Sequence, residues 1–406
     1  MLIRKLPRWT VAVLLSISAF GAGLAVSAAA SGTPTTTFYA CLHNGALSKV
    51  STSAHTCSTD YKAVSWNATG PRGIQGPKGT KGTNGRDGSP VACILVTLCA
   101  WSTNFSGGSY GFNVPYGIAF DGTHLWVANN EGNSVTELNA SDGSLVRTLS
   151  GALSGGFNFP YGIAFDGTHL WVTNEIGKSV TELNASNGSW VRTLSGGSYG
   201  FNAPFGVAFD GTHVWVANQN GDSVTELNAS DGSWVRTLSG GSYGFNDPYG
   251  VAFDGTRLWV TNQTGNSVTE LNASNGSWVR TLSGGSYGFD FPYGVAFDGT
   301  HVWVTNAFGK SVTELNASNG SWVRTLSGGS YGFSSPRGVA VDGTHLWVTN
   351  FGGNSVTELN ASDGSWVRTL SGGSSGLNGP DGIAFDGTHL WVTNPDGASV
   401  TEIWSH

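Results

Sequence analysis

Short apolar runs separated by turn residues recur along most of the chain. In the stretch 204–247 these runs are 206–209, 213–217, 223–227 and 234–238, and they are rich in valine, tryptophan, threonine and phenylalanine. Asp-Gly-Thr follows the first run and Asn-Ala-Ser-Asp-Gly follows the third. Asp-Gly between β-favouring runs is a strong hairpin signal, because glycine tolerates the positive φ of a tight turn. No window has helical apolar spacing over a comparable length, so the pattern predicts four antiparallel strands, A to D.

This four-strand unit repeats with a fixed period. The glycine two places after the repeat's proline stands at Gly117, Gly162, Gly206, Gly250, Gly294, Gly338 and Gly382. The first interval is 45 residues and each later interval is 44. Strand-rich units of this length are typical of propeller blades. The expected fold is therefore all-β, a seven-bladed β-propeller of four-stranded blades.

The two ends of the repeat array predict how the ring closes. The last unit stops after its strand C, at 399–404, and no strand D follows. The segment 101–105 begins at the same sequence separation from Pro115 as Trp190, the first residue of a strand D, has from Pro204. We expect this N-terminal segment to complete the seventh blade, which removes an open sheet edge.

The first thirty residues have the layout of an export signal. Arg4, Lys5 and Arg8 precede an apolar run over 11–30 that ends in small residues. This predicts a cleaved signal peptide, 1–30, and a secreted, extracellular or cell-surface protein. A retained membrane anchor is the alternative, because the run is long for a signal core. No other apolar run could span a bilayer, so no membrane span is expected after cleavage.

Two further segments precede the predicted propeller, 91–406. Residues 31–69 form a small module, and an even number of cysteines in an exported chain favours disulfides. Of the three possible pairings, Cys41–Cys57 with Cys93–Cys99 is the simplest, and the spacings match no zinc site. Residues 70–90 are seven consecutive Gly-X-Y triplets, which predict either a collagen-like homotrimer or an extended spacer.

Charge narrows the range of partners. Only 11% of the residues are charged and the net charge is −7. A nucleic-acid partner needs a basic stripe, so none is expected.

Tryptophan recurs at two places in the unit. One set, on strand B, is Trp126, Trp171, Trp215, Trp259, Trp303, Trp347 and Trp391. The other, on strand D, is Trp190, Trp234, Trp278, Trp322 and Trp366. Packing between blades is the simplest role for both sets, and an aromatic platform for sugars is the alternative.

Three polar sets also repeat with the unit. A histidine follows the Asp-Gly-Thr turn in six units, with Arg257 in its place in the fourth, and strands C and D carry a glutamate and an arginine. One histidine per blade cannot gather at one metal, and no unit has the oxygen density of a calcium loop, so neither a metal nor a cofactor is expected. The turn length places Glu226 opposite Arg236, which predicts a cross-strand ion pair in each blade, worth about 0.2–1 kcal/mol.

Differences between the copies lie beside the proline and after strand B. Because strands run up and down, the D–A and B–C loops emerge on the same face, and rigid scaffolds commonly carry binding loops. The candidate ligand-binding residues on this face are Tyr116, Glu131, Glu175, Gln219, Asp247, Gln263, Arg337 and Asp381. Two of them, Arg337 and Asp381, replace an aromatic residue. The alternative is that these differences between the copies arose by neutral drift, because loop tips are unconstrained.

The motifs PYGIAFDG, LWVTN and SVTELNASDG recur over 115–406 and resemble the NHL/YVTN class of propeller repeats. The cysteine module and the Gly-X-Y stretch, over 38–90, resemble the N-terminal part of secreted bacterial collagen-like proteins. The first resemblance implies a propeller, and the second implies a prokaryotic exported product.

Three functions are compatible with these patterns. We expect a secreted, non-enzymatic propeller that binds a glycan, a cell-wall component or an extracellular protein. A structural surface spacer is the alternative. Streptogramin lyases also resemble this propeller class, and that resemblance implies histidine and acidic residues around a metal on one face. A single active site must break the equivalence of the blades, and no unit carries an extra His/Glu pair, so the expectation is a protein that is not an enzyme and has no catalytic residues.

Overall fold

The computed structural model describes residues 102–151, 156–372 and 375–405, and five short strands nearer the N-terminus. The chain divides into two compact units, Met1–Ala92 and Cys93–His406. Among the described residues, no helix has the length and apolar character needed to cross a membrane.

The described strands of the first unit form two small sheets. β1 (Val13–Leu15) pairs with β2 (Val26–Ala28), and β3 (Phe38–His43) lies between β4 (Ala46–Ser51) and β5 (Lys62–Trp66). The signal-peptide cleavage, both disulfides and the collagen-like stretch fall outside the described residues or on side chains that are not described, so they stay predictions.

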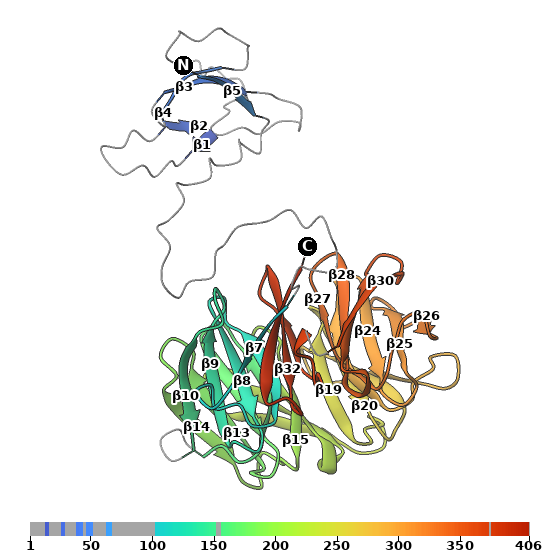
Figure 1. The fold of residues 1–406 in the computed structure, drawn as a ribbon. Helices are drawn as coiled ribbons and strands as arrows, with labels where there is room; N and C mark the ends of the chain where they lie inside the picture. Colours follow the sequence, from blue (N-terminus) through green and yellow to red (C-terminus); the bar gives the residue numbers. More distant parts are fainter. Residues whose placement is uncertain are drawn as a thin grey trace, which may run out of the picture. The chain divides into compact units, whose positions relative to one another are not determined.

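In the described part of the second unit, the strands form seven four-stranded antiparallel sheets, arranged as blades around an axis (Figure 1). Blades 1 to 3 are β7 (Pro115–Phe120), β8 (His124–Asn129), β9 (Ser134–Asn139), β10 (Leu145–Ser150); β11 (Pro160–Phe165), β12 (His169–Asn174), β13 (Ser179–Asn184), β14 (Trp190–Ser195); and β15 (Pro204–Phe209), β16 (His213–Asn218), β17 (Ser223–Asn228), β18 (Trp234–Ser239). Blades 4 and 5 are β19 (Pro248–Phe253), β20 (Arg257–Asn262), β21 (Ser267–Asn272), β22 (Trp278–Ser283); and β23 (Pro292–Phe297), β24 (His301–Asn306), β25 (Ser311–Asn316), β26 (Trp322–Ser327). Blade 6 is β27 (Pro336–Val341), β28 (His345–Asn350), β29 (Ser355–Asn360) and β30 (Trp366–Ser371). The all-β, seven-bladed prediction is confirmed.

Blade 7 is built from both ends of the repeat array, as the sequence predicted. It contains β31 (Ile383–Phe385), β32 (His389–Asn394) and β33 (Ser399–Trp404), and its outer strand is β6 (Ser102–Ser106). Asn104 Nδ2 donates to Gly376 O at 3.0 Å and to Thr401 Oγ1 at 3.1 Å. The Phe105 ring stacks on Trp391 with 5.5 Å between centroids. The ring is therefore closed by main-chain pairing and by side-chain contacts.

The strand-B tryptophans form the core between blades, as predicted. Trp126 of blade 1 is fully buried and packs with Ile163, Leu170 and Val172 of blade 2. The same prediction is wrong for the strand-D set, whose members are 46–48% exposed. Strand D is the outermost strand of each blade, so no further strand covers its ring.

The repeated glycine in strand A lets neighbouring blades approach closely. A Cβ on Gly206 would lie 2.1 Å from the carbonyl oxygen of Tyr249 in the next blade, and one on Gly382 would lie 2.2 Å from that of Tyr116. A real side-chain carbon cannot occupy either space. The same contact recurs around the ring and explains why this position is glycine in all seven units.

The predicted Glu–Arg pairs form in the described part of six blades and are more buried than expected. Glu226 lies opposite Arg236, with 2.8 Å between Arg236 Nε and Glu226 Oε2, and the glutamate side chain is 1% exposed. Burial raises the pKa of Glu226, and the charges of Arg236 and His213 oppose that rise. The pairs are Glu137–Arg147, Glu182–Arg192, Glu226–Arg236, Glu270–Arg280, Glu314–Arg324 and Glu358–Arg368.

The prediction of such a pair in every blade is wrong for blade 7. There Glu402 lies opposite Thr103. The outer strand comes from β6, outside the repeats, and has no arginine at that register position.

Candidate functional site

The D–A and B–C loops meet at one end of each blade, as predicted. The Gln219 amide donates to Ala203 O at 2.9 Å, and the Phe351 amide donates to Ser335 O at 3.1 Å. Both acceptors are the residue just before the repeat's proline.

That pre-proline residue has a left-handed backbone, which the repeat pattern did not predict. Val114, Phe159 and Asp247 have φ of 51°, 55° and 53°, a region that L-residues adopt rarely. At four blade boundaries the preceding blade holds its amide: Asn133 Oδ1 accepts from Phe159 N at 2.7 Å, and Asp222, Asn266 and Asn354 do the same for Asp247, Phe291 and Gly379. The variable loops are thus tied to one another between blades.

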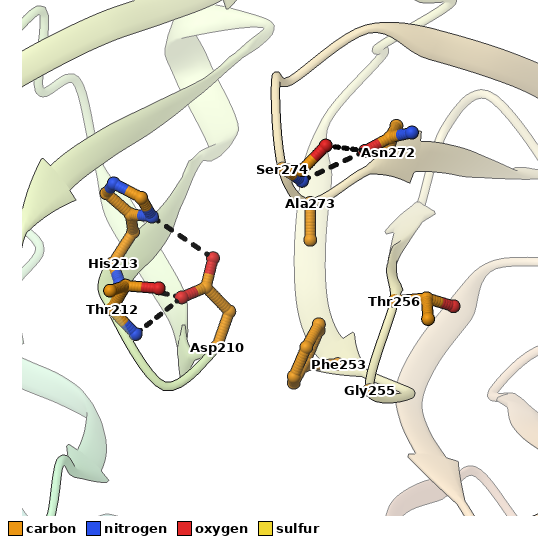
Figure 2. Close-up of a pocket in the computed structure, with 9 residues that line it drawn as sticks. All are labelled: Asp210, Thr212, His213, Phe253, Gly255, Thr256, Asn272, Ala273 and Ser274. Atoms are coloured by element: carbon orange, nitrogen blue, oxygen red, sulfur yellow. Dashed lines mark hydrogen bonds and ion pairs between the residues drawn. The ribbon is translucent and has the colours of Figure 1, made fainter.

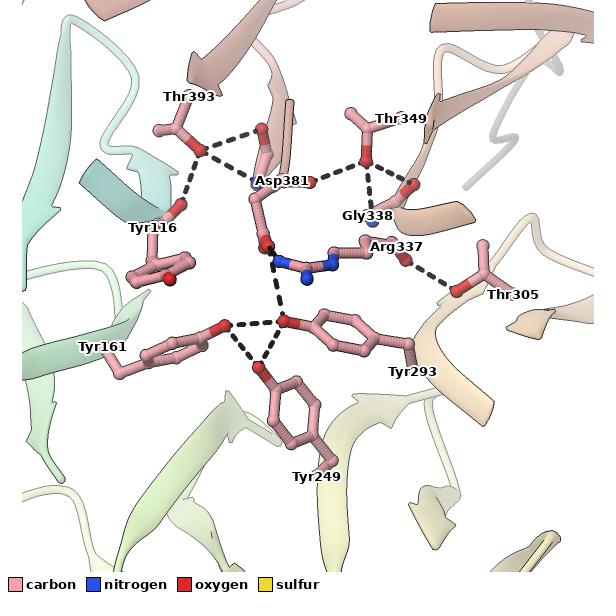
Figure 3. Close-up of polar contacts among 11 residues, drawn as sticks. Tyr116, Tyr161, Tyr249, Tyr293, Thr305, Arg337, Gly338, Thr349, Asp381 and Thr393 are labelled. Atoms are coloured by element: carbon pink, nitrogen blue, oxygen red, sulfur yellow. Dashed lines mark hydrogen bonds and ion pairs between the residues drawn. The ribbon is translucent and has the colours of Figure 1, made fainter. Parts of the chain in front are cut away.

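The residue after the proline faces the propeller axis. In six blades it lies at the start of the innermost strand, and in blade 7 it lies two residues before β31. Each innermost strand contacts the next one, and β31 contacts β7. The seven positions are Tyr116, Tyr161, Phe205, Tyr249, Tyr293, Arg337 and Asp381. Figure 3 shows six of these side chains converging from different blades. We call these seven residues the axial ring.

Three tyrosine hydroxyls of the axial ring form one hydrogen-bonded cluster. Tyr161 and Tyr293 hydroxyls are 2.7 Å apart, and the Tyr249 hydroxyl bonds to both. Burial is the main cause that raises the pKa of each of the three hydroxyls, those of Tyr161, Tyr249 and Tyr293, above its ordinary value. The three hydroxyls therefore stay protonated and act as donors and acceptors for one another.

The cluster ends at a buried ion pair. Tyr293 donates to Asp381 Oδ2 at 3.3 Å, and Arg337 Nη1 lies 2.6 Å from the same oxygen. Asp381 is 5% exposed. Burial raises the pKa of its carboxyl, and Arg337 and Tyr293 oppose the rise. Arg337 also stacks on Phe351, with its Cζ 3.4 Å from the ring centroid.

A second ring lies beside the first and is formed by the first residue after strand B. Its members are Asn130, Glu175, Gln219, Gln263, Ala307, Phe351 and Pro395. Asn130 Nδ2 donates to Pro160 O at 3.3 Å, and Gln219 Nε2 donates to Gln263 Oε1 at 3.0 Å. Burial raises the pKa of Glu175, and a hydrogen bond from Asn130 opposes the rise.

The structure brings most of the candidate residues together. Tyr116, Arg337 and Asp381 belong to the axial ring, and Glu175, Gln219 and Gln263 belong to the second ring. The remaining two stand apart. Glu131 is exposed in its loop, and Asp247 accepts a hydrogen bond from Thr264 within its own blade.

Sequence reasoning missed Tyr161, Tyr249, Tyr293 and Phe351. The first three recur from unit to unit, and a recurring aromatic residue is usually interpreted as a packing residue. They could have been found by position, because the candidate residue Tyr116 occupies the same place in its unit. Phe351 differs from its copies and was visible as a variable residue.

The arrangement has the parts for proton transfer and for binding a polar group. It combines a carboxyl of raised pKa, a fixed cation and a connected set of hydroxyls. It does not fit a metal. Among the described residues, no group of three or more His, Cys, Asp or Glu is close enough to share an ion. The carboxylate on the axis, that of Asp381, is already paired with Arg337.

Solved structures of known proteins share the fold. Virginiamycin B lyase from Staphylococcus aureus, in a catalytically inactive form with quinupristin, is 18% identical, with TM-score 0.62, over 75% of this chain and 99% of that one. A streptogramin B lyase is 18% identical, with TM-score 0.60, over 75% and 98%. Kuenenia stuttgartiensis hydrazine synthase is 19% identical, with TM-score 0.59, over 75% and 98%. At such identities the likeness establishes the fold alone.

Two other comparisons find nothing. No protein-family model matches the chain. No curated protein is found as a relative.

The expectation that the protein is not an enzyme is corrected by these findings. Propellers that match this chain over three quarters of its length include lyases, so this fold gives no reason to exclude an enzyme. The argument from symmetry also fails, because it counted only histidine and glutamate. At the axis, Arg337 and Asp381 make two blades differ from the other five, and neither residue is a histidine or a glutamate.

Proposed function

We propose that the axial ring is the active site of a lyase-like enzyme. The observation that carries the proposal is the Arg337–Asp381 ion pair. It replaces two aromatic residues of the axial ring, and it is hydrogen-bonded to the cluster of three tyrosine hydroxyls. The lyases among the structures of this fold support it. The hydrazine synthase of the same fold shows why the chemistry must be argued from the residues themselves.

The residues can supply each part of an elimination. Asp381 takes a proton from a carbon beside a carbonyl, and the electron pair of that C–H bond forms a carbon–carbon double bond. The bond to the leaving group breaks, and the leaving group departs with that bond's electron pair. A tyrosine hydroxyl donates a proton to it, and Asp381 returns a proton to the tyrosine cluster through Tyr293. Arg337, with 21% of its side chain exposed, is placed to hold the carbonyl oxygen as negative charge develops.

The proposal is tested by incubating the purified full chain with quinupristin, the compound bound in one of the lyase structures. Mass spectrometry distinguishes the reactions, because elimination adds no water and hydrolysis adds one. We expect conversion without added water, reduced at least about 100-fold by Asp381→Asn, since a positioned acid or base contributes about 10²–10⁴-fold.

Glu131→Gln is the matched control, because it removes one carboxylate from the same face outside the cluster. It should leave conversion unchanged. If the wild type converts no quinupristin, the streptogramin-type activity is wrong. If Asp381→Asn converts it as fast as the wild type, the axial ring is the wrong site.

We also propose three features on sequence pattern alone. The repeats are of the NHL/YVTN type, the protein is extracellular, and it forms a homotrimer through residues 70–90.

A further inference from the structure

Equivalent cavities lie between blades on the opposite face, which carries the A–B and C–D turns. In the described propeller, three of them have volumes of about 560, 510 and 460 Å³, at the boundaries of blades 3 and 4, 4 and 5, and 1 and 2. Each is lined by Asp and Thr of one A–B turn, by Phe, Gly and Thr of the next, by a His that follows one of these two turns, and by the Asn-Ala-Ser turn of the second blade. These volumes are in the range of ligand pockets, about 300–1,000 Å³.

The cavity between blades 3 and 4 has a rigid wall (Figure 2). Asp210 Oδ1 accepts from the amides of Thr212 and His213 at 2.8 and 2.6 Å, and its Oδ2 accepts from the Trp215 indole at 2.7 Å. On the other side, Asn272 Oδ1 accepts from the Ser274 amide at 2.9 Å and from its hydroxyl at 2.7 Å. These bonds hold both turns in place without a ligand.

The surface offered by this cavity mixes hydroxyls with an aromatic ring. Thr212, Thr256 and Ser274 are exposed at its edge, and Phe253 is a half-buried part of its lining. Small hydroxyl groups on rigid turns can donate to and accept from a polyhydroxylated ligand. The ring supplies apolar contact area.

The hairpin that lines each of these cavities also carries an exposed tryptophan. The hairpin that contributes Asn272 carries Trp278, which stands opposite Leu271 and is 47% exposed. Its indole donates to Thr281 Oγ1 at 3.0 Å, which fixes the ring. Trp322 and Trp190 hold the same register position in the hairpins that line the other two cavities.

We propose that these cavities, each with its outer tryptophan, are subsites for a neutral oligosaccharide. Sugars present hydroxyls at their edges and apolar C–H faces, which match the turn hydroxyls and the tryptophan face. The carboxylate of Asp210 in the wall and the net charge of −7 disfavour an acidic glycan. Repetition around the ring lets one polymer contact several subsites, so that weak sites combine into firm attachment.

The face differs from the one expected to bind ligands. The turns on this face are nearly identical between units. A repeated site needs the same identity, because each copy must recognise the same sugar unit. The inference is independent of the axial ring.

Isothermal titration of the full chain tests the proposal, with a glucose hexasaccharide, an N-acetylglucosamine hexasaccharide and, as the acidic probe, a galacturonate hexasaccharide. We expect one neutral probe to bind with a stoichiometry above one per chain, and the acidic probe to bind at least about tenfold more weakly. Trp278→Ala should remove one site. Binding of neither neutral probe, or a stoichiometry that Trp278→Ala leaves unchanged, would overturn the proposal.

Two further variants make the test independent of folding defects. Blade 1 has Leu145 where blades 2 to 6 have the outer tryptophan, so Leu145→Trp should add one site. Trp404→Ala is the matched control, because Trp404 is 51% exposed but lies on a strand C. A site gained through Leu145→Trp supports the subsites, whereas a site lost through Trp404→Ala contradicts them.

Discussion

Arg337 and Asp381 stand where the other five blades place an aromatic residue. Burial makes either charge unfavourable when it is alone. Each charged side chain is tolerated at this site because the other neutralises it. A buried pair of this kind is weak evidence for stability, since apolar residues of similar volume often serve as well or better. The pair therefore indicates a function that aromatic residues cannot perform.

Removing one partner should cost more stability than removing both. Arg337→Ala leaves the Asp381 carboxylate buried without a cation, and we expect the free energy of unfolding to fall by about 3 kcal/mol. Arg337→Met combined with Asp381→Leu should recover most of that loss. Urea unfolding at pH 7 measures both. Equal losses for the single and the double variant would contradict a buried ionic pair.

The raised pKa of Asp381 predicts a pH dependence of stability. Burial is the main cause of the shift from the ordinary value of 3.8, so the folded protein keeps this proton at pH values where the unfolded chain has released it. The stabilisation is fully present below the unfolded pKa and is lost as pH rises through the folded pKa. The difference in unfolding free energy between wild type and Asp381→Asn should therefore decrease from pH 3 upward. A constant difference would mean that Asp381 titrates normally.

Strand A is the element that sets the distance between blades. Its glycine lies against the next blade's backbone, and its following residues pair with strand B. In blade 3 the register of strands A and B shifts between Pro204 and Val207, and this irregularity recurs in blades 1, 2, 4, 5 and 6. The innermost strand is therefore irregularly paired in its own sheet, and it also lies against the innermost strands of both neighbouring blades.

A methyl group at this glycine should separate two blades. Gly206→Ala places a Cβ 2.1 Å from Tyr249 O, and we expect a loss of about 1–3 kcal/mol, the usual cost of overpacking. Thermal or urea unfolding measures it. Gly241→Ala is the matched control, because nothing lies within 4 Å of its Cβ. That variant should be neutral or stabilised by about 0.4–1 kcal/mol. Equal effects at the two sites would contradict the close approach.

The whole ring depends on a blade whose strands come from both ends of the described propeller. Local contacts cannot hold β6 against β33, so the join rests on tertiary pairing and on the Phe105–Trp391 stack. An open edge at β33 would be a template for another chain.

Weakening this join should produce self-association as well as lower stability. We expect Phe105→Ala to destabilise the protein by about 2–3 kcal/mol, to speed amide exchange in β33 and to cause concentration-dependent association. Hydrogen exchange and sedimentation measure these effects. Leu194→Ala is the control, because Leu194 holds the same register position in blade 2, where all four strands are continuous in sequence. It should lose stability without associating.

The sequence by itself determined the strands, the turns, the number of blades and the Glu–Arg register. All of these depend on local chemistry repeated at one period: an Asp-Gly turn, alternation in a strand and the length of a hairpin loop. The seventh blade could also be predicted, because a missing strand at one end matched a spare one at the other. Glu402 departs from the pattern because its partner strand lies outside the repeats.

Only the tertiary structure decided which residues meet. Tyr161, Tyr249 and Tyr293 are 44 to 132 residues apart and touch because ring closure points equivalent positions at one axis. Exposure of the strand-D tryptophans was likewise decided by their place on the outermost strand, which nothing in a single unit specifies. The left-handed residue before each proline depends on loops of the same blade and, at four boundaries, of the preceding one. A repeat encodes one blade, and the sites form only where several blades meet.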